Sequence, residues 1–295
     1  MKLLRNCLTA VLAAVFLFST GMVLRLMWEN HMAEESRARA QSLALADTAP
    51  QQDPAPENAP AAAPIIRDPV EALPLTRFTS DLPKGSRLPK PEPKTIADPL
   101  AIPLGALELA PLTEINSDVV GWIHIPGTGI DYPIVHGADN DYYLLHTWDG
   151  YYSSAGAVFM EATHAPDFSG FSTILYAHNS QGGGRFGALR SYRYQEFWEE
   201  NPYVYLVTAS GCFRYRIYAA YEAELTAPTY WSRVDTPELQ QVFLDYGMNQ
   251  SWFETDRVPE NGAPVLTLST CTGYTNARRW VVQAVLEGPI EAPAE

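Results

Sequence analysis

The chain has 295 residues, a hydrophobic fraction of 46% and a formal net charge of −14. Its length allows one large domain or two small ones, and its apolar fraction is ample for a packed core. The acidic balance disfavours binding to a nucleic-acid backbone, which needs clustered Lys and Arg to displace counterions. The three cysteines, Cys7, Cys212 and Cys271, are widely spaced and odd in number, so they predict neither a disulfide framework nor a zinc motif.

The N-terminus has the pattern of a membrane-targeting segment. Lys2 and Arg5 precede an apolar stretch of about 22 residues that ends at Trp28, which is long enough to cross a bilayer. Positive charge ahead of the stretch predicts a cytoplasmic N-terminus and an extracellular remainder. A cleaved signal peptide is the alternative, because residues 19–21 are small. The length of the apolar run favours an uncleaved, single-pass transmembrane signal anchor over residues 1–30.

Residues 31–103 differ in composition from the rest of the chain. Ala, Pro, Glu and Gln dominate, and aromatic residues almost vanish. Such a stretch cannot bury enough apolar surface to offset the entropy of ordering it, and its prolines favour extended backbone. We therefore predict a disordered Ala/Pro-rich spacer, then a catalytic domain over 104–289 and a tail over 290–295. A short helix over 32–45 has only weak support.

From residue 104 onward, β-branched and aromatic residues recur in short runs separated by turn residues. An amphipathic helix is predicted over 107–115, where it would cover the first strand. Eight strands are predicted at 119–125, 130–135, 157–160, 172–177, 203–208, 212–222, 264–271 and 280–286. Helices are predicted at 186–198 and 237–253, the second capped by Thr236. Eight strands with few helices favour a closed or nearly closed β-barrel.

Three side chains with complementary chemistry stand at ends of predicted strands. Cys271 ends one apolar run, His178 ends another just before a glycine-rich loop, and Arg278 and Arg279 open the last strand. A thiolate can act as nucleophile, an imidazole can protonate a leaving amine, and a fixed cation can stabilise an oxyanion. This combination indicates thiol-dependent acyl transfer.

Each of these residues has an alternative reading. A free cysteine is most often a small buried hydrophobe, which is the role predicted for Cys212. Because side chains alternate along a strand, only one of Arg278 and Arg279 can share the face of Cys271. The other five histidines have no neighbouring catalytic motif and are expected to be structural.

Several motifs in order along the chain resemble class B sortases. They are Val120-Gly-Trp-Ile-His-Ile-Pro-Gly-Thr128, Ile130-Asp-Tyr-Pro-Ile-Val135, Asp139-Asn-Asp-Tyr-Tyr-Leu144, Tyr176-Ala-His-Asn179 leading to Arg185-Phe-Gly-Ala-Leu189, and Thr267-Leu-Ser-Thr-Cys271 followed by Arg279-Trp-Val-Val282. The match runs from about residue 107 to about residue 286. It is therefore more specific than the short cysteine motif by itself.

The resemblance implies a mainly β fold, a closed eight-stranded sortase-type barrel with an N-terminal helix and a long helix between strands 6 and 7. It implies a cysteine transpeptidase with Cys271 as nucleophile, His178 as acid and base, and Arg279 as oxyanion donor. Arg279 is selected because it lies two residues before the paired valines. No metal or other cofactor is expected.

The resemblance also implies partners. These are exported proteins with a C-terminal sorting signal, and an amine from a peptidoglycan precursor or from a pilin lysine; no nucleic acid is expected. Asn179, Ser269 and Thr270 are expected to line the substrate groove.

An exported cysteine peptidase that only hydrolyses remains an alternative, and a catalytically idle binding module is disfavoured by the intact Cys, His and Arg set. The turn after Cys271 contains no acidic residue, so any carboxylate assistance to His178 must come from elsewhere.

Overall fold

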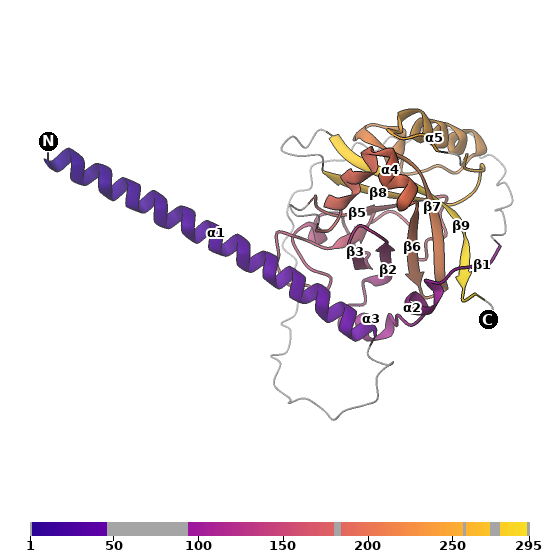
Figure 1. The fold of residues 1–295 in the computed structure, drawn as a ribbon, viewed down its shortest axis with the longest axis horizontal. Helices are drawn as coiled ribbons and strands as arrows, with labels where there is room; N and C mark the ends of the chain where they lie inside the picture. The colour runs from indigo at the N-terminus through magenta and orange to yellow at the C-terminus, as the bar shows by residue number, and fades with distance from the viewer. Residues whose placement is uncertain (1, 46–93, 180–183, 256–257, 272–277, 294–295) are drawn as a thin grey trace, which may run out of the picture.

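The computed structural model describes residues 2–45, 94–179, 184–255, 258–271 and 278–293, and its centre is a closed β-barrel (Figure 1). The strands are β1 (Ile96–Ala97), β2 (Val119–Ile125), β3 (Ile130–Val135), β4 (Val158–Met160), β5 (Ser172–Tyr176), β6 (Tyr203–Thr208), β7 (Gly211–Glu224), β8 (Val265–Cys271) and β9 (Arg278–Glu291). They follow the order β1-β9-β7-β6-β2-β3-β4-β5-β8, and a further pairing between β8 and β9 closes the ring. Because β1 only pairs with the end of β9, strands β2 to β9 form the barrel.

The predicted eight-stranded barrel is confirmed, and its sheet is mixed. β3 pairs with β4 and β5 pairs with β8 in parallel, whereas the other barrel pairs are antiparallel. β7 and β9 run longer than predicted, since they pair with each other from Phe213 and Pro289 to Glu224 and Arg278. The two-residue strand β1 was not predicted, because two residues show no periodicity.

Apolar side chains fill the barrel and a second layer under its long helix. The barrel interior includes Ile123, Leu206, Ile217, Leu268, Trp280 and Val282. Helix α5 (Pro237–Gln250) lies between β7 and β8 in the chain, as predicted, and buries Phe243 and Leu244 against the outside of the sheet. The predicted cap is also confirmed, because the Thr236 side chain accepts a hydrogen bond from the Leu239 N–H.

The shorter helices differ from prediction in their boundaries. The region predicted as one helix over 107–115 holds α3 (Ala110–Ile115), preceded by α2 (Ala101–Gly105). Pro111 lies in the first turn of α3, where a backbone N–H would have no acceptor within the helix, so proline costs no hydrogen bond there. The predicted helix over 186–198 is a 3₁₀ segment, η4 (Gly187–Arg193), followed by α4 (Gln195–Glu200). Tyr194 separates them because its backbone is extended, with φ −105° and ψ 130°.

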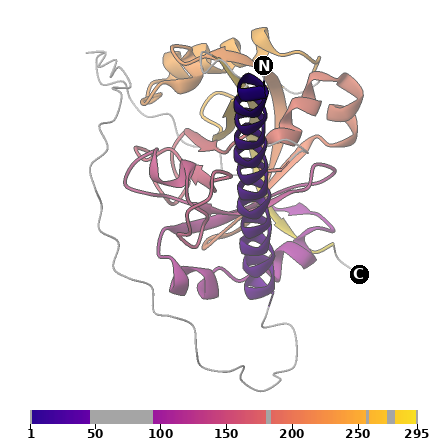
Figure 2. The same cartoon turned by 90° about the vertical axis from the view of Figure 1, so that its left-hand side faces the viewer.

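A long N-terminal helix, α1 (Lys2–Ala44), lies at one side of the barrel and its N-terminal part extends away from it (Figures 1 and 2). Its C-terminal part contacts β3 and α3. Ala33, Ala40 and Ala44 are at most 2% exposed, and such small side chains allow the helix to approach closely. At its end, the Glu108 N–H donates to the Ala44 carbonyl at 2.8 Å.

The structure differs from the predicted spacer at both of its edges. Residues 31–44 belong to α1 and pack on the barrel, and residues 96–103 include β1 and most of α2. The packed face of α1 uses alanine and polar side chains, so composition did not reveal it. Residues 46–93 of the predicted spacer lie outside the described residues. Among the residues described, no helix is both long enough and apolar enough to span a membrane.

Candidate active site

Three neighbouring strands bring the predicted catalytic positions to one end of the barrel. β8 pairs in parallel with β5 as far as Tyr176 and Ser269, and it pairs antiparallel with β9 as far as Cys271 and Arg279. Two residues beyond the last β5–β8 pair, the same register brings His178 level with Cys271. The backbone therefore gathers positions 178, 271 and 279 from segments that are far apart in the sequence.

The register also distinguishes the two adjacent arginines. Arg279 lies directly opposite position 271, and directly opposed residues of an antiparallel pair project from the same face. Arg278 lies opposite Glu224 of β7 and forms an ion pair with it at 3.4 Å, with 55% of the Arg278 side chain exposed. Arg279 therefore shares the sheet face of position 271. The Cys271 side chain and the turn at 272–277 lie outside the described residues.

His178 is held by the backbone of a neighbouring loop. Its Nε2 lies 2.7 Å from the Leu144 carbonyl oxygen. Because a carbonyl can only accept, this hydrogen bond assigns the proton of the neutral imidazole to Nε2 and leaves Nδ1 with the lone pair. The His178 carbonyl accepts from the Phe186 N–H at 3.1 Å, which ties the residue to the chain beyond the glycine-rich loop. The arrangement supplies an imidazole whose Nδ1 can take up a proton.

A polar cluster on the same face was not found from the sequence. Tyr176, two residues before His178, donates to Glu161 at 3.0 Å. Burial, together with the Glu161 carboxylate, raises the pKa of Tyr176, and Arg279 acts in the opposite direction, so the guanidinium lies within electrostatic reach of the phenol. Strand alternation from His178 could have identified Tyr176, whereas Glu161 lies just past β4, where no pattern indicated it.

The three predicted groove residues have different surroundings. Ser269 is 1% exposed, and its Oγ lies 2.8 Å from the hydroxyl of Tyr230, the last residue of the 3₁₀ segment η5 (Pro228–Tyr230). Thr270 is 2% exposed, and its hydroxyl has no hydrogen-bond partner among the described residues. Because neighbouring residues alternate in a strand, Thr270 faces the barrel interior, away from the face of position 271. Asn179 is half-buried and forms a β-bridge with Arg185.

Cys212 and two of the other histidines have surroundings that account for them structurally. Burial raises the pKa of Cys212 to about 11, so its thiol stays protonated near neutral pH. His146 stacks on Tyr142, with ring centroids 4.0 Å apart. His164 accepts from the Ile174 N–H at 3.2 Å, and burial lowers its pKa. In the described part of the chain, no three His, Cys, Asp or Glu side chains gather to hold a metal ion.

Comparison with known proteins identifies the same part of the chain. The sortase domain family matches residues 123–287. The chain is 35% identical to sortase B of Listeria monocytogenes over 56% of this chain and 67% of that protein. It is 30% identical to sortase B of Staphylococcus aureus, over 58% and 70% of the two chains. The structure of a Staphylococcus aureus sortase B–substrate complex superposes with a TM-score of 0.57 and 27% identity, covering 60% of this chain and 83% of that one.

Proposed function

The chain belongs to the sortase family of transpeptidases, and we propose that it cleaves a C-terminal sorting signal of exported proteins through a Cys271 thioacyl intermediate. The acyl group is then transferred to an amine of a cell wall precursor. The observation that supports this proposal is the strand register, in which Arg279 pairs with position 271 and the parallel β5–β8 pairing ends two residues before His178 and Cys271.

Acylation uses each of the three side chains once. The Cys271 thiolate attacks the carbonyl carbon of the scissile peptide, and the Arg279 guanidinium donates hydrogen bonds to the oxyanion that forms. The C–N bond then breaks as the His178 imidazolium protonates the leaving amine. Nδ1 is the nitrogen that performs this transfer, because Nε2 is engaged with the Leu144 carbonyl.

Deacylation reverses the proton transfer. An incoming amine attacks the thioacyl carbon and gives its proton to His178 Nδ1, and the C–S bond breaks to return the thiolate. The reaction needs no oxidant or reductant.

The sorting signal would lie along the face that carries position 271. The Tyr176 and Tyr230 hydroxyls supply polar groups beside the strand, and Glu161 fixes the first of them. Ser269 acts through its contact with Tyr230, since its own hydroxyl is buried. Thr270 contributes backbone rather than side chain to this face, and Asn179 shapes the chain next to His178.

Sortases are membrane-associated or cell-surface enzymes, and we place this chain on the outer surface with residues 7–28 as its anchor. Large apolar side chains in that segment project outward from α1, with Phe16, Leu17 and Phe18 exposed by 69%, 70% and 76%. Such exposure suits a lipid environment. External protease applied to intact cells should cut the chain within residues 46–93, and a chain that stays intact would contradict this topology.

Intact-mass spectrometry tests the proposed chemistry. Full-length protein in detergent is mixed with a library of pentapeptide sorting signals, and the mass of one acyl fragment should be added to it. The Cys271→Ala variant should show no added mass. Addition of an amine acceptor should convert the adduct to an amide product. Release of free acid at the same rate with and without the amine would favour a hydrolytic peptidase, and absence of any adduct would contradict the proposal.

A further inference from the structure

The C-terminal part of α1 is bound to the loop that holds His178. We propose that this docked helix is a positioning element for His178, acting through the 144–156 loop and through Arg185. The inference rests on the proposed role of His178 as acid and base. It assigns to α1 a part in the reaction in addition to any part in anchoring the chain.

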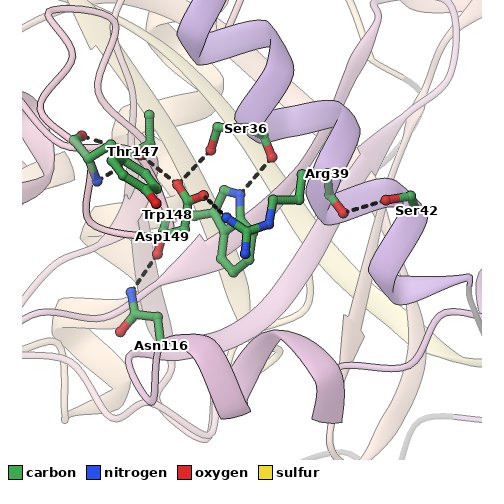
Figure 3. A network of polar contacts seen from close by, with 8 residues as sticks. Ser36, Arg39, Ser42, Asn116, Thr147, Trp148 and Asp149 are labelled. Carbon is green, nitrogen blue, oxygen red and sulfur yellow. Dashed lines mark hydrogen bonds and ion pairs between the residues drawn. The ribbon is translucent and has the colours of Figure 1, made fainter. Parts of the chain in front are cut away.

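The first connection is a polar network between α1 and the loop (Figure 3). The Ser36 hydroxyl donates to Asp149 at 2.7 Å, and Arg39 donates to the same carboxylate at 3.4 Å. The Trp148 indole donates to the Ser36 carbonyl at 2.8 Å, and Ser154 donates to Glu29. All of the loop partners lie within twelve residues of Leu144, whose carbonyl holds His178 Nε2. The helix thus restrains the segment that orients the imidazole.

The helix side chains contribute to the stability of this loop. The Asp149 side chain is only 2% exposed, so its charge needs hydrogen-bond donors in place of water. Besides the two donors from α1, the Thr147 hydroxyl donates to the same carboxylate at 2.7 Å. Loss of α1 would remove two of these three donors and expose the carboxylate to water, which favours a different loop conformation.

The second connection passes through a stacked tyrosine. The guanidinium of Arg37 from α1 lies 4.7 Å from the ring centroid of Tyr132, and that of Arg185 lies 4.9 Å from the same centroid. The Tyr132 hydroxyl also accepts from the Arg185 N–H at 3.2 Å. Arg185 is 5% exposed, and its φ of 53° is unusual for a residue other than glycine. Its surrounding contacts hold the backbone in this conformation. The next residue, Phe186, donates to the His178 carbonyl.

Both connections meet at Gly156. Its carbonyl accepts from Arg185 Nε at 3.0 Å. A Cβ at this position would lie 3.1 Å from His178 Cδ2 and 2.8 Å from the Leu144 carbonyl oxygen. Gly156 therefore lies beside the imidazole and the Leu144 carbonyl and also binds Arg185, with little free space around it. Undocking of α1 would free the loop on one side and Arg185 on the other.

Loss of these contacts should affect chemistry more than substrate binding. A displaced Leu144 carbonyl no longer fixes the proton on Nε2, so a fraction of His178 would carry it on Nδ1. In that tautomer Nδ1, the nitrogen that faces the reaction, could not accept a proton from the incoming amine. A misoriented imidazole also lengthens the proton transfer to the leaving amine. The binding face beside β8 does not include α1. Undocking should therefore lower kcat and leave KM near its original value.

The test compares helix-side variants of the full-length protein in detergent. The Ser36→Ala/Arg37→Ala/Arg39→Ala variant removes the helix donors to Asp149 and the cation on Tyr132 while leaving the loop sequence intact. Glu35→Ala is the matched control, because Glu35 is 58% exposed and its ion pair is with His31 of the same helix. The triple variant should lose about tenfold or more in kcat, the scale of a small misplacement of a reacting group, and the control should lose nothing.

Nitrogen NMR of histidine-labelled protein provides a readout that is independent of turnover. In the original chain the His178 signals should show a proton on Nε2, and in the triple variant they should shift toward a mixture of the two tautomers. Arg37→Lys, which retains a cation over Tyr132, should recover part of the original behaviour. If the triple variant does not fold, Arg37→Ala alone tests the second connection, because it removes the cation over Tyr132 and leaves the donors to Asp149 in place.

The outcomes separate this inference from the proposed function. Unchanged kcat together with unchanged His178 signals in a folded variant would overturn the positioning role and leave the transpeptidase proposal intact. An equal loss in the Glu35→Ala control would also overturn it. If the original chain forms no thioacyl adduct, the proposed function fails, and the tautomer comparison still decides whether α1 orients the imidazole.

Discussion

Replacement of the two adjacent arginines, one at a time, should give very different rates of acylation. Arg279 lies opposite position 271, so Arg279→Ala removes the proposed oxyanion donor. Loss of one such donor costs about 2.7–4 kcal/mol, or about 100- to 1,000-fold in rate. Arg278 points away, with 55% of its side chain exposed, and its contacts to Glu224 and Glu222 are 3.4 Å and 3.9 Å long. Exposed ion pairs contribute about 0–1 kcal/mol to stability, so Arg278→Ala should leave the acylation rate within a few-fold.

Single-turnover acylation with one sorting-signal peptide measures the difference directly. Each variant is mixed in excess over the peptide, and the thioacyl adduct is followed by intact mass against time. Arg279→Lys serves as an intermediate case, because it retains the charge and loses the planar fork that can donate two hydrogen bonds. Its rate should fall between those of the original chain and Arg279→Ala. Thermal melts followed by circular dichroism show whether any loss reflects unfolding.

Two results would refute this reasoning. If Arg278→Ala is the variant that loses activity, the arginine that faces the substrate is the other one, and the β8–β9 register is shifted by one residue. If both variants acylate at the original rate, the oxyanion is stabilised by other donors and the role assigned to Arg279 is wrong. Equal partial losses in both would indicate a general effect of positive charge near the site.

The remaining predictions concern the thiols, a glycine and the acid stability. Cys271→Ala should abolish the thioacyl adduct and Cys212→Ala should preserve it, because burial raises the pKa of Cys212 to about 11; adduct with Cys271→Ala would disprove the assignment. Gly156→Ala should destabilise the protein by about 3 kcal/mol and Gly129→Ala by about 1 kcal/mol. Both glycines have positive φ, but an added Cβ at Gly156 would lie 2.7 Å from a backbone oxygen whereas the space at Gly129 is open; equal losses in urea unfolding would contradict this difference. Burial lowers the pKa of His164, so the unfolded chain takes up a proton first as the pH falls below about 6.5, and stability should decrease there. His164→Gln should flatten that part of the stability curve, and an unchanged curve would show that other groups control it.

Much of the barrel could be predicted because each strand has its own local pattern. Alternation and turn residues located eight strands, and the capping preference of Thr236 located the start of α5. Cys271, His178 and Arg279 could be selected from the order of motifs, and the strand register then placed Arg279 opposite position 271. Local patterns are sufficient here because strands and capped helices depend mainly on short-range sequence.

The contacts of α1 could not be predicted in the same way. The helix packs through Ala33 and Ala40 and through polar side chains such as Ser36, so its buried face carries few large apolar side chains. Its partners, Trp148 and Asp149, are more than a hundred residues away in the sequence. Tyr230 was missed for a similar reason, because it ends a three-residue 3₁₀ segment with no periodicity of its own and reaches β8 only in the folded chain. Long-range polar packing leaves little signal in a single sequence.

The position of the site on the barrel links catalysis to closure of the sheet. β8 is the strand that closes the ring, since it pairs with β5 on one side and with β9 on the other. His178 follows β5 on one side of this strand, Arg279 lies in β9 on the other side, and position 271 ends β8 itself. Any opening of the ring at β8 would therefore separate all three groups at once, whereas fraying of β1 at the far end of β9 would separate none of them. Residual activity under mild denaturing conditions should consequently follow the pairing of β8, and it should be insensitive to the state of the β1 edge.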